Sequence, residues 1–335
     1  MILVVGGAGF VGSHMAKHLR KCGEPHVIFD NLSTGHRIAV GGSDLVVGDL
    51  LNPQEIAAAL DRYRPDVVLH FAAKSLVGES LTKPHAYWEN NIVGGWNLLE
   101  AMRSRGIGRI VFSSTAAIYG NPDRVPIAES APKRPVSPYG ETKLAFEQML
   151  GAYGRAYGLK SVSLRYFNAA GADPGGEIGE DHRPETHLIP AAILAATRGE
   201  ILKVYGDDYA TADGTCVRDY VHVTDLCDAH GLAIRHLRTG GASVAYNLGS
   251  GGGFSVLDVV QAVGASTGRV LKTEVAPRRE GDPATLIASS AAIRQDWGWV
   301  PQYVDLGVIV EHAANWRAGH PEGYTDERGP GKPPI

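Results

Sequence analysis

The feature that most constrains this chain is a short apolar run near its start that leads into closely spaced glycines, ILVVGGAGFVGS over residues 2–13. The pattern predicts a buried strand that ends at Val5, then a loop, then a helix that begins above the loop. Gly7, Gly9 and Gly12 permit a tight turn, close approach of a pyrophosphate, and packing of the helix against the strand. Because the free N–H groups and the dipole of a helix N-terminus favour anions, the loop indicates a nucleotide-phosphate site.

A carboxylate follows where such a site needs one. The next apolar run, residues 26–29, ends in Asp30, about twenty residues beyond the loop, where a carboxylate can accept hydrogen bonds from an adenosine ribose. A glycine-rich loop alone can be a structural turn, but the acid in this position favours a dinucleotide site. Asp30 would repel a 2′-phosphate, and no Lys or Arg follows it before Arg37. NAD is therefore favoured over NADP.

Strand, loop and helix patterns continue to alternate up to Tyr166, which predicts a Rossmann-type doubly wound parallel sheet in the α/β class. Asn52 and Ser137 indicate helix starts, because each is a good N-cap followed by proline. Between these two helices a long helical pattern runs over residues 87–103. The strands predicted after the first two cover residues 44–47, 66–70, 109–112 and 160–166.

Beyond Phe167 the sequence changes to glycine, proline and charge, which is typical of a domain boundary. We therefore expect a dinucleotide-binding domain over residues 1–166 and a smaller mixed α/β domain over residues 167–335, with some elements interleaved with the first. The tail after His320, rich in Gly and Pro, is expected to be loosely held. The elements predicted for the smaller domain are helices near residues 189–198, 224–237, 255–266 and 306–317 and a strand at 203–205.

Composition excludes several kinds of function. The chain has 335 residues, enough for a sizeable core, and its net charge of −4 comes without a basic run of the kind that binds nucleic acid. Cys22, Cys216 and Cys227 have no metal-ligand spacing, so we interpret them as small buried side chains in a reducing compartment and expect no metal. The first strand leaves no room for a signal peptide, and no apolar run approaches membrane-spanning length. We expect a cytoplasmic protein with neither nucleic-acid nor membrane partners.

Tyr139 and Lys143 lie four residues apart on a predicted helix, so their side chains project from one face. Such a pair can act in acid–base chemistry, because the ammonium group stabilises the phenolate. A phenol ionises near pH ~10, so catalysis near neutrality needs about 4 kcal/mol of preferential stabilisation of the phenolate. The preceding strand ends in the hydroxyl residues 113–115, at the cofactor edge of the sheet. Taken alone, the pair could equally be an exposed tyrosine beside a solvated lysine.

Together these features resemble the short-chain dehydrogenase/reductase superfamily in its extended form, which has a C-terminal substrate domain. The resemblance then sharpens, since motifs along most of the chain are similar, in order, to those of the UDP-glucose 4-epimerase family. These motifs are VGGAGFVGSH (5–14), DNL (30–32), VGES (77–80), FSST (112–115), SPYG (137–140), RYFN (165–168), residues 214–222 and RREGD (278–282). The resemblance implies an NAD-dependent isomerase of carbohydrate metabolism, in particular of galactose metabolism.

Carried over position by position, the resemblance makes Tyr139 the general base for the sugar 4-hydroxyl, Lys143 its electrostatic partner, and Thr115 a second ligand of that hydroxyl. The positions that would contact NAD are Gly6, Gly7, Gly9, Phe10, Val11, Gly12, Asp30, Asn31, Leu32, Ser33, Thr34, Gly35, Asp49, Leu50, Phe71, Ala72, Ala73, Ser75, Asn90, Ser113, Ser114, Tyr139, Lys143 and Phe167. The positions that would contact the UDP-sugar are Ser114, Thr115, Tyr139, Phe167, Asn168, His187, Leu188, Lys203, Val204, Tyr205, Arg218, Tyr220, Arg279, Asp282 and Leu286.

Two of the substrate positions are also supported by a physical argument. Arg218 and Arg279 suit a pyrophosphate, because a guanidinium is a fixed fork of donors. Arg218 could instead form a structural ion pair with its neighbour Asp219, and Asp282 could be an ordinary turn residue after Gly281.

The resemblance implies interconversion of UDP-galactose and UDP-glucose. Tyr139 would remove the O4 proton while a hydride leaves C4, and the resulting 4-ketosugar would turn over and receive the hydride on its other face. NAD would stay bound throughout, as a prosthetic group. The family also implies a homodimer formed by the helices over residues 87–103 and 138–157.

Three positions depart from the family pattern. Val5 stands where threonine is usual, and Thr115 replaces a frequent serine but keeps the hydroxyl. Ser75 stands where some members have a lysine near the cofactor, so NAD retention is expected to be weaker.

Two other functions compete with this one. A sugar-nucleotide 4,6-dehydratase shares the early steps, but the family resemblance gives such enzymes an acidic pair directly after the threonine, where this chain has Ala116 and Ala117. A non-catalytic NAD-sensing protein on the same fold would not need Tyr139, Lys143 and Thr115 together.

Leu286 bears on which sugars fit. In the family this position resembles a gate beside the sugar 2-substituent, occupied by tyrosine in members restricted to glucose and galactose and by smaller residues in members that also accept N-acetylhexosamines. Leucine is smaller than tyrosine, so activity on UDP-N-acetylhexosamines is expected. Leu286 could instead be a core residue of a short strand.

Overall fold

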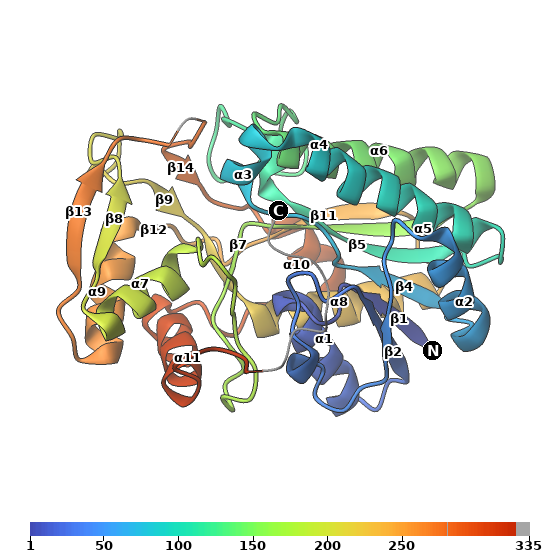
Figure 1. Cartoon of the computed structure of the whole chain (residues 1–335). Helices are drawn as coiled ribbons and strands as arrows, with labels where there is room; N and C mark the ends of the chain where they lie inside the picture. The colour runs from blue at the N-terminus through green and yellow to red at the C-terminus, as the bar shows by residue number, and fades with distance from the viewer. Residues whose placement is uncertain (280, 326–335) are drawn as a thin grey trace.

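A seven-stranded parallel sheet between two layers of helices forms the larger part of the protein (Figure 1). The structure is a computed structural model that describes residues 1–279 and 281–325. In spatial order the strands of this sheet are β11 (Val244–Leu248), β6 (Lys160–Tyr166), β5 (Arg109–Thr115), β4 (Val67–His70), β1 (Ile2–Val5), β2 (His26–Asp30) and β3 (Leu45–Val47). Every neighbouring pair in it runs parallel. The predicted doubly wound parallel sheet is confirmed.

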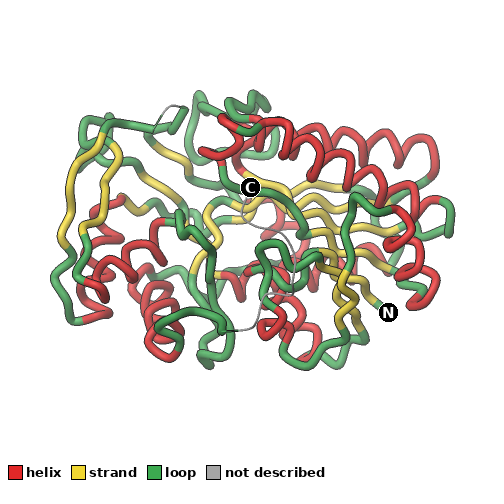
Figure 2. The backbone as a smooth tube through the Cα atoms, in the orientation of Figure 1, coloured by secondary structure: helices red, strands yellow, loops and turns green. Residues whose placement is uncertain are grey.

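The two helix layers follow from the alternation of side chains along β1. One layer contains α1 (Phe10–Lys21), α8 (Val223–Arg238) and α10 (Ala291–Trp297), and the other contains α2 (Pro53–Tyr63), α5 (Gly94–Arg103) and α6 (Pro138–Tyr157). Ile2 and Val4 pack into the first layer, whereas Leu3 and Val5 pack into the second. None of these four side chains is more than 1% exposed, which is why β1 is apolar at every position. Figure 2 shows strands enclosed by helices on both faces.

Both predicted helix starts are confirmed. The side chain of Asn52 accepts a hydrogen bond from the Gln54 N–H, and that of Ser137 accepts one from the Gly140 N–H, each at 3.2 Å. The pattern over residues 87–103 is helical throughout but not regular. A π-helical stretch, η2 (Trp88–Val93), joins α4 (Pro84–Tyr87) to α5; the remaining short elements of this part are α3 (Val77–Thr82), η1 (Arg37–Val40) and η3 (Ala116–Tyr119).

The smaller part of the structure packs around an apolar core of its own, which includes Ile193, Leu202 and Ile309. Its strands are β7 (Asn168–Ala170) paired with β10 (Tyr220–His222), β8 (Ile201–Tyr205) paired with β13 (Lys272–Ala276), and β9 (Val217–Arg218) between β12 (Phe254–Ser255) and β14 (Thr285–Leu286). Its helices are α7 (Leu188–Arg198), α9 (Val256–Thr267) and α11 (Leu306–Gly319). The helices predicted near 189–198, 255–266 and 306–317 and the strand at 203–205 are therefore confirmed.

Two elements beyond residue 166 belong to the larger sheet. β11 pairs with β6 at the edge of that sheet, and α8 packs through Leu226, Ala233 and Leu237 into the cluster that contains Ile2 and Val4. We expected the helix near 224–237 in the smaller domain, and this assignment is wrong. Its periodicity predicts an apolar face but not the sheet that this face covers. The expected interleaving of elements is present, while the division of the chain at residue 166 stays a prediction.

The cysteines are free, and they differ in burial. Cys216 and Cys227 are buried as expected, but Cys22 is exposed, so its interpretation as a buried side chain is wrong. It caps the C-terminus of α1, where the chain turns at the surface, and its Sγ lies 3.6 Å from Nε2 of His18. A single small residue carries no periodic signal that would have placed it. Within residues 1–279 and 281–325, no helix has the length and apolar character needed to cross a membrane.

Asp219 links the smaller part of the protein to the loop that follows β11. Its side chain is fully buried, and one carboxylate oxygen accepts hydrogen bonds from the N–H (2.8 Å) and hydroxyl (2.7 Å) of Ser250. The other oxygen accepts from the N–H groups of Gly251 (3.1 Å) and Ala288 (3.0 Å). These donors offset the cost of burying a carboxylate. Asp219 is therefore engaged with backbone donors, and the ion pair with Arg218 considered from the sequence is not formed.

We expect Asp219→Asn to lower the free energy of unfolding by about 2–4 kcal/mol, because an amide NH₂ would face backbone N–H groups and leave them without an acceptor. Urea unfolding measures the loss. Asp123→Asn, at an exposed side chain, is the matched control and should change stability by less than about 0.5 kcal/mol. Similar stabilities for the two variants would contradict the role given to Asp219.

Candidate active site

The glycine loop joins β1 to α1, and each of its glycines is required, or leaves space, for a different steric reason. Gly6 has a φ of +79°, in the left-handed region that favours glycine, and a Cβ there would overlap the backbone of Ala72. A Cβ on Gly12 would overlap the Gly6 carbonyl, so Gly12 lets α1 approach the loop. At Gly9 the nearest heavy atom to a Cβ would be the Gly6 carbonyl oxygen, at 3.6 Å. Gly9 therefore leaves open space, which is where a pyrophosphate would lie.

The first turn of α1 is suited to an anion. Its N-cap is Gly9, which supplies no capping side chain, and no acidic residue stands in this turn. The N–H groups of a helix start that lacks a side-chain cap attract phosphate through hydrogen bonds and the helix dipole. The loop and the helix start therefore fit the pyrophosphate of a dinucleotide.

Asp30 lies at the end of β2 and is 8% exposed. Its carboxylate accepts hydrogen bonds from the N–H groups of Ala8 (2.9 Å) and Leu32 (2.8 Å), one on each oxygen, and each oxygen keeps a lone pair for a ribose hydroxyl. Burial raises the pKa of Asp30, although these two hydrogen bonds lower it. Further donors from a ribose would stabilise the carboxylate. Leu32 has a φ of +57°, a strained conformation of the kind that gathers at ligand sites.

The remaining cofactor positions follow the ends of neighbouring strands, so the parallel topology brings them to one edge of the sheet. After β2 and β3, the amide of Asn31 donates a hydrogen bond to the carboxylate of Asp49 (3.1 Å). After β4, residues 71–73 are half-buried beside the loop, while Ser75 is exposed. Asn90 is half-buried within η2. Which of these side chains contact NAD stays a prediction.

Sequence reasoning missed Asn91, the neighbour of Asn90. Asn91 is 5% exposed; its Oδ1 accepts a hydrogen bond from the Lys74 N–H (2.9 Å), and its Nδ2 donates to the Lys74 carbonyl (3.1 Å) and to the Thr142 hydroxyl (3.1 Å). It thereby fixes the loop after β4 to α6. The signal that could have found it is the tandem Asn pair inside an otherwise apolar helical pattern.

Tyr139, Lys143 and Thr115 come together where the end of β5 meets the start of α6. Lys143 is 3% exposed and donates a hydrogen bond to the Ser113 carbonyl (2.7 Å). Its Nζ lies 5.9 Å from the centre of the Tyr139 ring, and the Thr115 side chain hydrogen-bonds to Tyr139. The Thr115 hydroxyl oxygen also accepts the Ala117 N–H (3.1 Å). The shared face predicted from the spacing of Tyr139 and Lys143 is confirmed.

Burial acts on the two titratable groups in opposite directions. It raises the pKa of Tyr139, and the hydrogen bond with Thr115 offsets only part of this. It lowers the pKa of Lys143 to about 7, although the nearby Glu147 carboxylate favours the charged form. The protein alone therefore does not lower the pKa of Tyr139, which is consistent with the expected sharing of this stabilisation between Lys143 and a positive nicotinamide. A positive charge from the nicotinamide ring has to supply part of the stabilisation.

Ser114 was predicted to contact both cofactor and substrate, but its hydroxyl turns toward α6 and donates to Glu147 (2.6 Å). Glu147 forms a buried ion pair with Arg165 (2.7 Å), and Arg165 donates to the hydroxyl of Tyr119 (2.9 Å). Through Glu147, this network lies next to Lys143. Sequence reasoning missed Glu147, although its position one helical turn after Lys143 could have indicated it.

The predicted substrate residues of the smaller part include two close pairs. A guanidinium nitrogen of Arg218, on β9, lies 3.3 Å from the carboxylate of Asp282. The guanidinium of Arg279 lies 4.0 Å from the centre of the Tyr205 ring. The Asp282 N–H also donates to the Arg279 carbonyl (3.3 Å), so Asp282 is both a turn residue and an ion-pair partner. The Arg218 guanidinium also donates to the carbonyls of Val217 and Pro283, each at 2.9 Å. Binding of a pyrophosphate by the two arginines stays a prediction.

The other predicted substrate positions differ in what their side chains can reach. Along β8, Lys203 and Tyr205 are exposed, whereas Val204 is 3% exposed and packs with Tyr209 and Cys216. The alternation of the strand turns the Val204 side chain into the core, so only the backbone of this residue can meet a ligand, and its contact with the UDP-sugar stays a prediction.

A second set of predicted positions lies close to the parallel sheet. Phe167 and Leu286 pack against the same buried cluster, which contains Tyr119. Asn168 donates its N–H to the Asp219 carbonyl (2.9 Å). Tyr220 is 4% exposed.

His187 and Leu188 stand at the start of α7. His187 is the N-cap, with its Nδ1 2.9 Å from a carboxylate oxygen of Glu180, and Leu188 is half-buried against the core of the smaller part.

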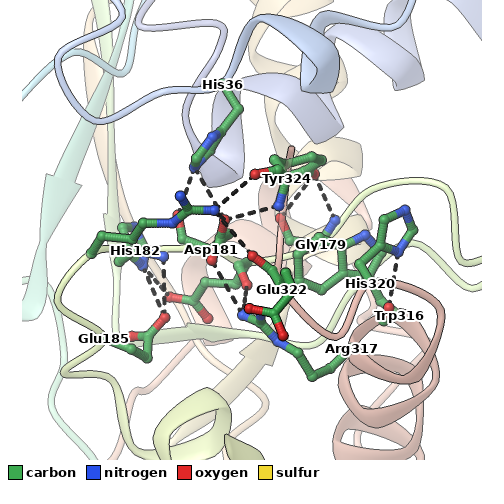
Figure 3. Close-up of polar contacts among 12 residues, drawn as sticks. His36, Gly179, Asp181, His182, Glu185, Trp316, Arg317, His320, Glu322 and Tyr324 are labelled. Carbon is green, nitrogen blue, oxygen red and sulfur yellow. Dashed lines mark hydrogen bonds and ion pairs between the residues drawn. The ribbon is translucent and has the colours of Figure 1, made fainter. Parts of the chain in front are cut away.

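The loop before α7 and the chain beyond α11 meet through Asp181 and Tyr324 (Figure 3). Both segments line a cavity together with residues 8–10 of the glycine loop. Asp181 accepts hydrogen bonds from the Tyr324 N–H (3.0 Å) and from Arg183 (3.1 Å), and its backbone carbonyl lies 3.0 Å from Nε2 of His36. Tyr324 is 5% exposed and donates its hydroxyl to the Gly179 carbonyl (3.2 Å). A small cavity remains between these segments, lined by Ala8, Gly9, Phe10, Ser13, Thr34, His36, Ala39, Gly179, Asp181, His182 and Tyr324.

We expected the tail after His320 to be loosely held. This expectation is wrong for the residues as far as Tyr324. The buried tyrosine and the Asp181 carboxylate fix it by contacts with a segment about 140 residues away, which no local pattern encodes. The residues from 326 lie outside the described part of the chain.

Comparison with known proteins gives a consistent result. The sequence model of the NAD dependent epimerase/dehydratase family matches residues 2–249. A UDP-glucose 4-epimerase of Streptococcus mutans is 52% identical over 331 residues, which cover 97% of this chain and 99% of that protein.

Solved structures of 4-epimerases are also similar to this chain. The UDP-glucose 4-epimerase of Brucella ovis in complex with NAD has a TM-score of 0.91 and 50% identity and covers 93% of this chain and 97% of its own. The UDP-Glc/GlcNAc 4-epimerase of Campylobacter jejuni has a TM-score of 0.82 and 38% identity and covers 95% and 99%.

The open space at Gly9 generates a prediction about the cofactor. We expect Gly9→Ala to weaken NAD binding by about 1–3 kcal/mol, roughly 5–150-fold in Kd, because the added methyl group would stand where the pyrophosphate approaches. Titration of cofactor-free protein with NAD measures it. The stability of the cofactor-free variant should stay within about 0.5 kcal/mol of the parent.

Gly78→Ala is the control, since a Cβ there would meet no atom within 4 Å, and it should bind NAD normally. Normal NAD binding by Gly9→Ala would show that the pyrophosphate does not lie over this loop.

Proposed function

This chain belongs to the NAD dependent epimerase/dehydratase family, and from that premise we propose that it works as a UDP-glucose 4-epimerase, an isomerase that interconverts UDP-glucose and UDP-galactose. One observation carries the proposal: Tyr139, Lys143 and Thr115 meet at the end of β5, in the parallel sheet whose glycine loop fits NAD. The relatives named above, similar over nearly the whole chain, carry the same activity in their names.

Tyr139 acts as the base in this reaction. Its phenolate oxygen takes the proton of the sugar 4-hydroxyl, and the Thr115 hydroxyl, which already bonds to Tyr139, orients that hydroxyl. Lys143, held by the Ser113 carbonyl, places positive charge beside the phenolate. NAD would be held by the glycine loop and Asp30, and it would supply a reversible hydride acceptor for C4. The proton returns from Tyr139 to O4, so the net reaction changes configuration and not oxidation state.

Inversion requires the sugar to turn over while the nucleotide stays in place. Arg218 and Arg279 hold the pyrophosphate through forked hydrogen bonds, and the neutral 4-ketosugar has no charged group that would anchor it in one orientation. Rotation about the pyrophosphate linkage then presents the other face of the ketone. Residues 179–182 and Tyr324 cover the glycine loop, and this cover keeps the cofactor bound between the two half-reactions.

A 4,6-dehydratase activity is not favoured. Thr115 is followed by Ala116 and Ala117 in η3, so no carboxyl group stands directly after the threonine to protonate a departing hydroxyl. A non-catalytic NAD sensor would not require a buried lysine beside a tyrosine, where burial penalises the charge.

We also propose a homodimer through η2, α5 and α6. Val93 is 46%, Trp96 50% and Tyr157 60% exposed. Large apolar side chains that are exposed together on one face are typical of a surface that contacts another protein. The expected cytoplasmic location likewise stays a prediction.

The sugar specificity follows from Leu286. It lies on β14, half-buried beside Phe167, where its side chain also contributes to the cluster around Tyr119. A leucine leaves more room than a tyrosine beside the sugar 2-substituent. We therefore propose that the enzyme also accepts UDP-N-acetylhexosamines, as the name of the Campylobacter jejuni relative indicates for that protein.

We expect Tyr139→Phe to lower kcat by about 10²–10⁴-fold while NAD stays bound, because the change removes one proton-transfer oxygen and leaves the ring in place. Conversion of UDP-galactose to UDP-glucose without added NAD measures the activity, and absorbance of the purified protein measures the cofactor.

Thr115→Ser is the matched control, since it keeps a hydroxyl, and it should retain much more activity than Thr115→Ala. Near-normal turnover by Tyr139→Phe would remove Tyr139 from the mechanism.

We expect measurable epimerisation of UDP-N-acetylglucosamine by the parent enzyme, and loss of this activity in Leu286→Tyr with activity on UDP-glucose preserved. A phenol ring would overfill the space beside the sugar, at a cost of about 1–3 kcal/mol. Chromatographic separation of the products gives both rates. If the parent enzyme is inert toward the N-acetyl sugar while it interconverts UDP-glucose and UDP-galactose, the gate argument is wrong.

A further inference from the structure

A cluster of four metal-ligating side chains lies in the loop between β7 and α7, and the proposed reaction does not use it as such. Glu180, His182, Glu185 and His187 each offer one ligand atom, and these atoms all lie within 4.8 Å of one another. The residues fall within the run EDHRPETH, over residues 180–187. We expected no metal from the sequence, because only the cysteines were considered as ligands.

Four distances between donor atoms lie close to those of a tetrahedral site. Nδ1 of His187 and Nδ1 of His182 lie 2.9 and 3.3 Å from one oxygen of Glu180. The same nitrogens lie 3.4 and 3.5 Å from the oxygens of Glu185. In a tetrahedral zinc site with metal–ligand distances of about 2.0–2.2 Å, neighbouring donors are about 3.3–3.6 Å apart. Small shifts would therefore bring all four donors around a single ion.

The two imidazole nitrogens lack a satisfactory partner. Nδ1 of His182 and Nδ1 of His187 are buried atoms that make no well-aligned hydrogen bond, despite their short distances to the carboxylates. Both nitrogens point into the space between Glu180 and Glu185. Such orphaned ligand atoms are unusual in a folded protein and are explained by an ion between them.

The surroundings support the two carboxylates as ligands. The side chains of Glu180 and Glu185 are only 7% and 5% exposed. One oxygen of Glu185 accepts the N–H groups of Thr186 and His187, both at 2.9 Å, and the other accepts the N–H of His182 at 3.3 Å. These bonds orient the carboxylate, and its second oxygen keeps a lone pair for an ion. The imidazoles are 24% and 40% exposed, so an ion can enter from solvent.

We propose that Glu180, His182, Glu185 and His187 bind a zinc ion in a structural site that closes the loop between β7 and α7. Two imidazoles and two carboxylates are a donor set that zinc accepts, and four protein donors leave no open position for catalysis. The inference goes beyond the epimerase function and does not depend on it. The ion fixes the segment that covers the glycine loop, because Asp181 and His182 of this segment line the cavity there.

Without a metal, the same residues form a cluster of ion pairs. Burial disfavours charge on both imidazoles, but the nearby carboxylates of Glu180 and Glu185 raise the pKa of His182 to about 9 and that of His187 to about 10. Zinc must displace these protons to bind. The experiment therefore has to distinguish a metal site from a set of imidazolium–carboxylate pairs.

The test uses untagged full-length protein, freed of metal with a chelator and titrated with zinc against a chromophoric competitor. We expect one tight equivalent of zinc per chain and a rise in melting temperature on zinc addition, since the ion binds the folded state. Co²⁺ in place of zinc should give the intense visible absorption of a tetrahedral site. His182→Gln should lower zinc affinity by more than about tenfold, the smallest usual cost of losing even an outer-shell partner.

His85→Gln, at an exposed histidine outside the cluster, is the matched control and should leave zinc affinity unchanged. Glu185→Gln provides a second variant should His182→Gln not fold, and it too should lose the tight equivalent. Absence of a tight equivalent in the parent protein, a Co²⁺ spectrum without tetrahedral bands, or equal zinc affinity in the parent and a folded cluster variant would each overturn the proposal. The readouts are independent of epimerase activity, so failure here leaves the proposed function intact.

Discussion

The contact between β1 and the start of α1, where no side chain fits, is the constraint on which the rest of the structure depends. A Cβ at Gly12 would overlap the Gly6 carbonyl, and one at Gly6 would overlap the loop after β4. Because this contact is so close, the N-terminus of α1 is held directly above the end of the central strand. The anion site, the carboxylate of Asp30 and the ends of the neighbouring strands then share one edge of the sheet.

Burial governs the chemistry at that edge. It raises the pKa of Tyr139 and lowers that of Lys143, because each charge alone is costly away from water. A phenolate and an ammonium formed side by side offset each other, and a bound positive cofactor adds to this. The buried ion pair of Glu147 and Arg165 lies next to Lys143. Because the pair has no net charge, it can pack there without a large electric field at Tyr139, Lys143 and Thr115.

Closure of the cofactor edge depends on segments distant in sequence. The loop before α7 reaches the glycine loop through Asp181, and the chain beyond α11 is fixed there by Tyr324. The proposed zinc site lies in the same loop, so one ion would stiffen the cover. Asp219 links the smaller part of the protein to the loop that follows β11. Its carboxylate accepts hydrogen bonds from four donors, which belong to residues 250–251 and to Ala288.

The sequence alone determined what depends on neighbouring residues. The period of the apolar residues gave the parallel strands and most helices, Asn52 and Ser137 fixed two helix starts, and the spacing of Tyr139 and Lys143 placed both on one face. Tertiary structure alone decided which surface each element covers and which partner each polar group meets. It brought α8 and β11 to the first sheet, turned the Ser114 hydroxyl toward Glu147, and fixed Tyr324 to a loop far away in the chain. Local patterns record a residue's own conformation and its preference for burial, whereas the identity of a partner more than a hundred residues away is set only by packing of the whole chain.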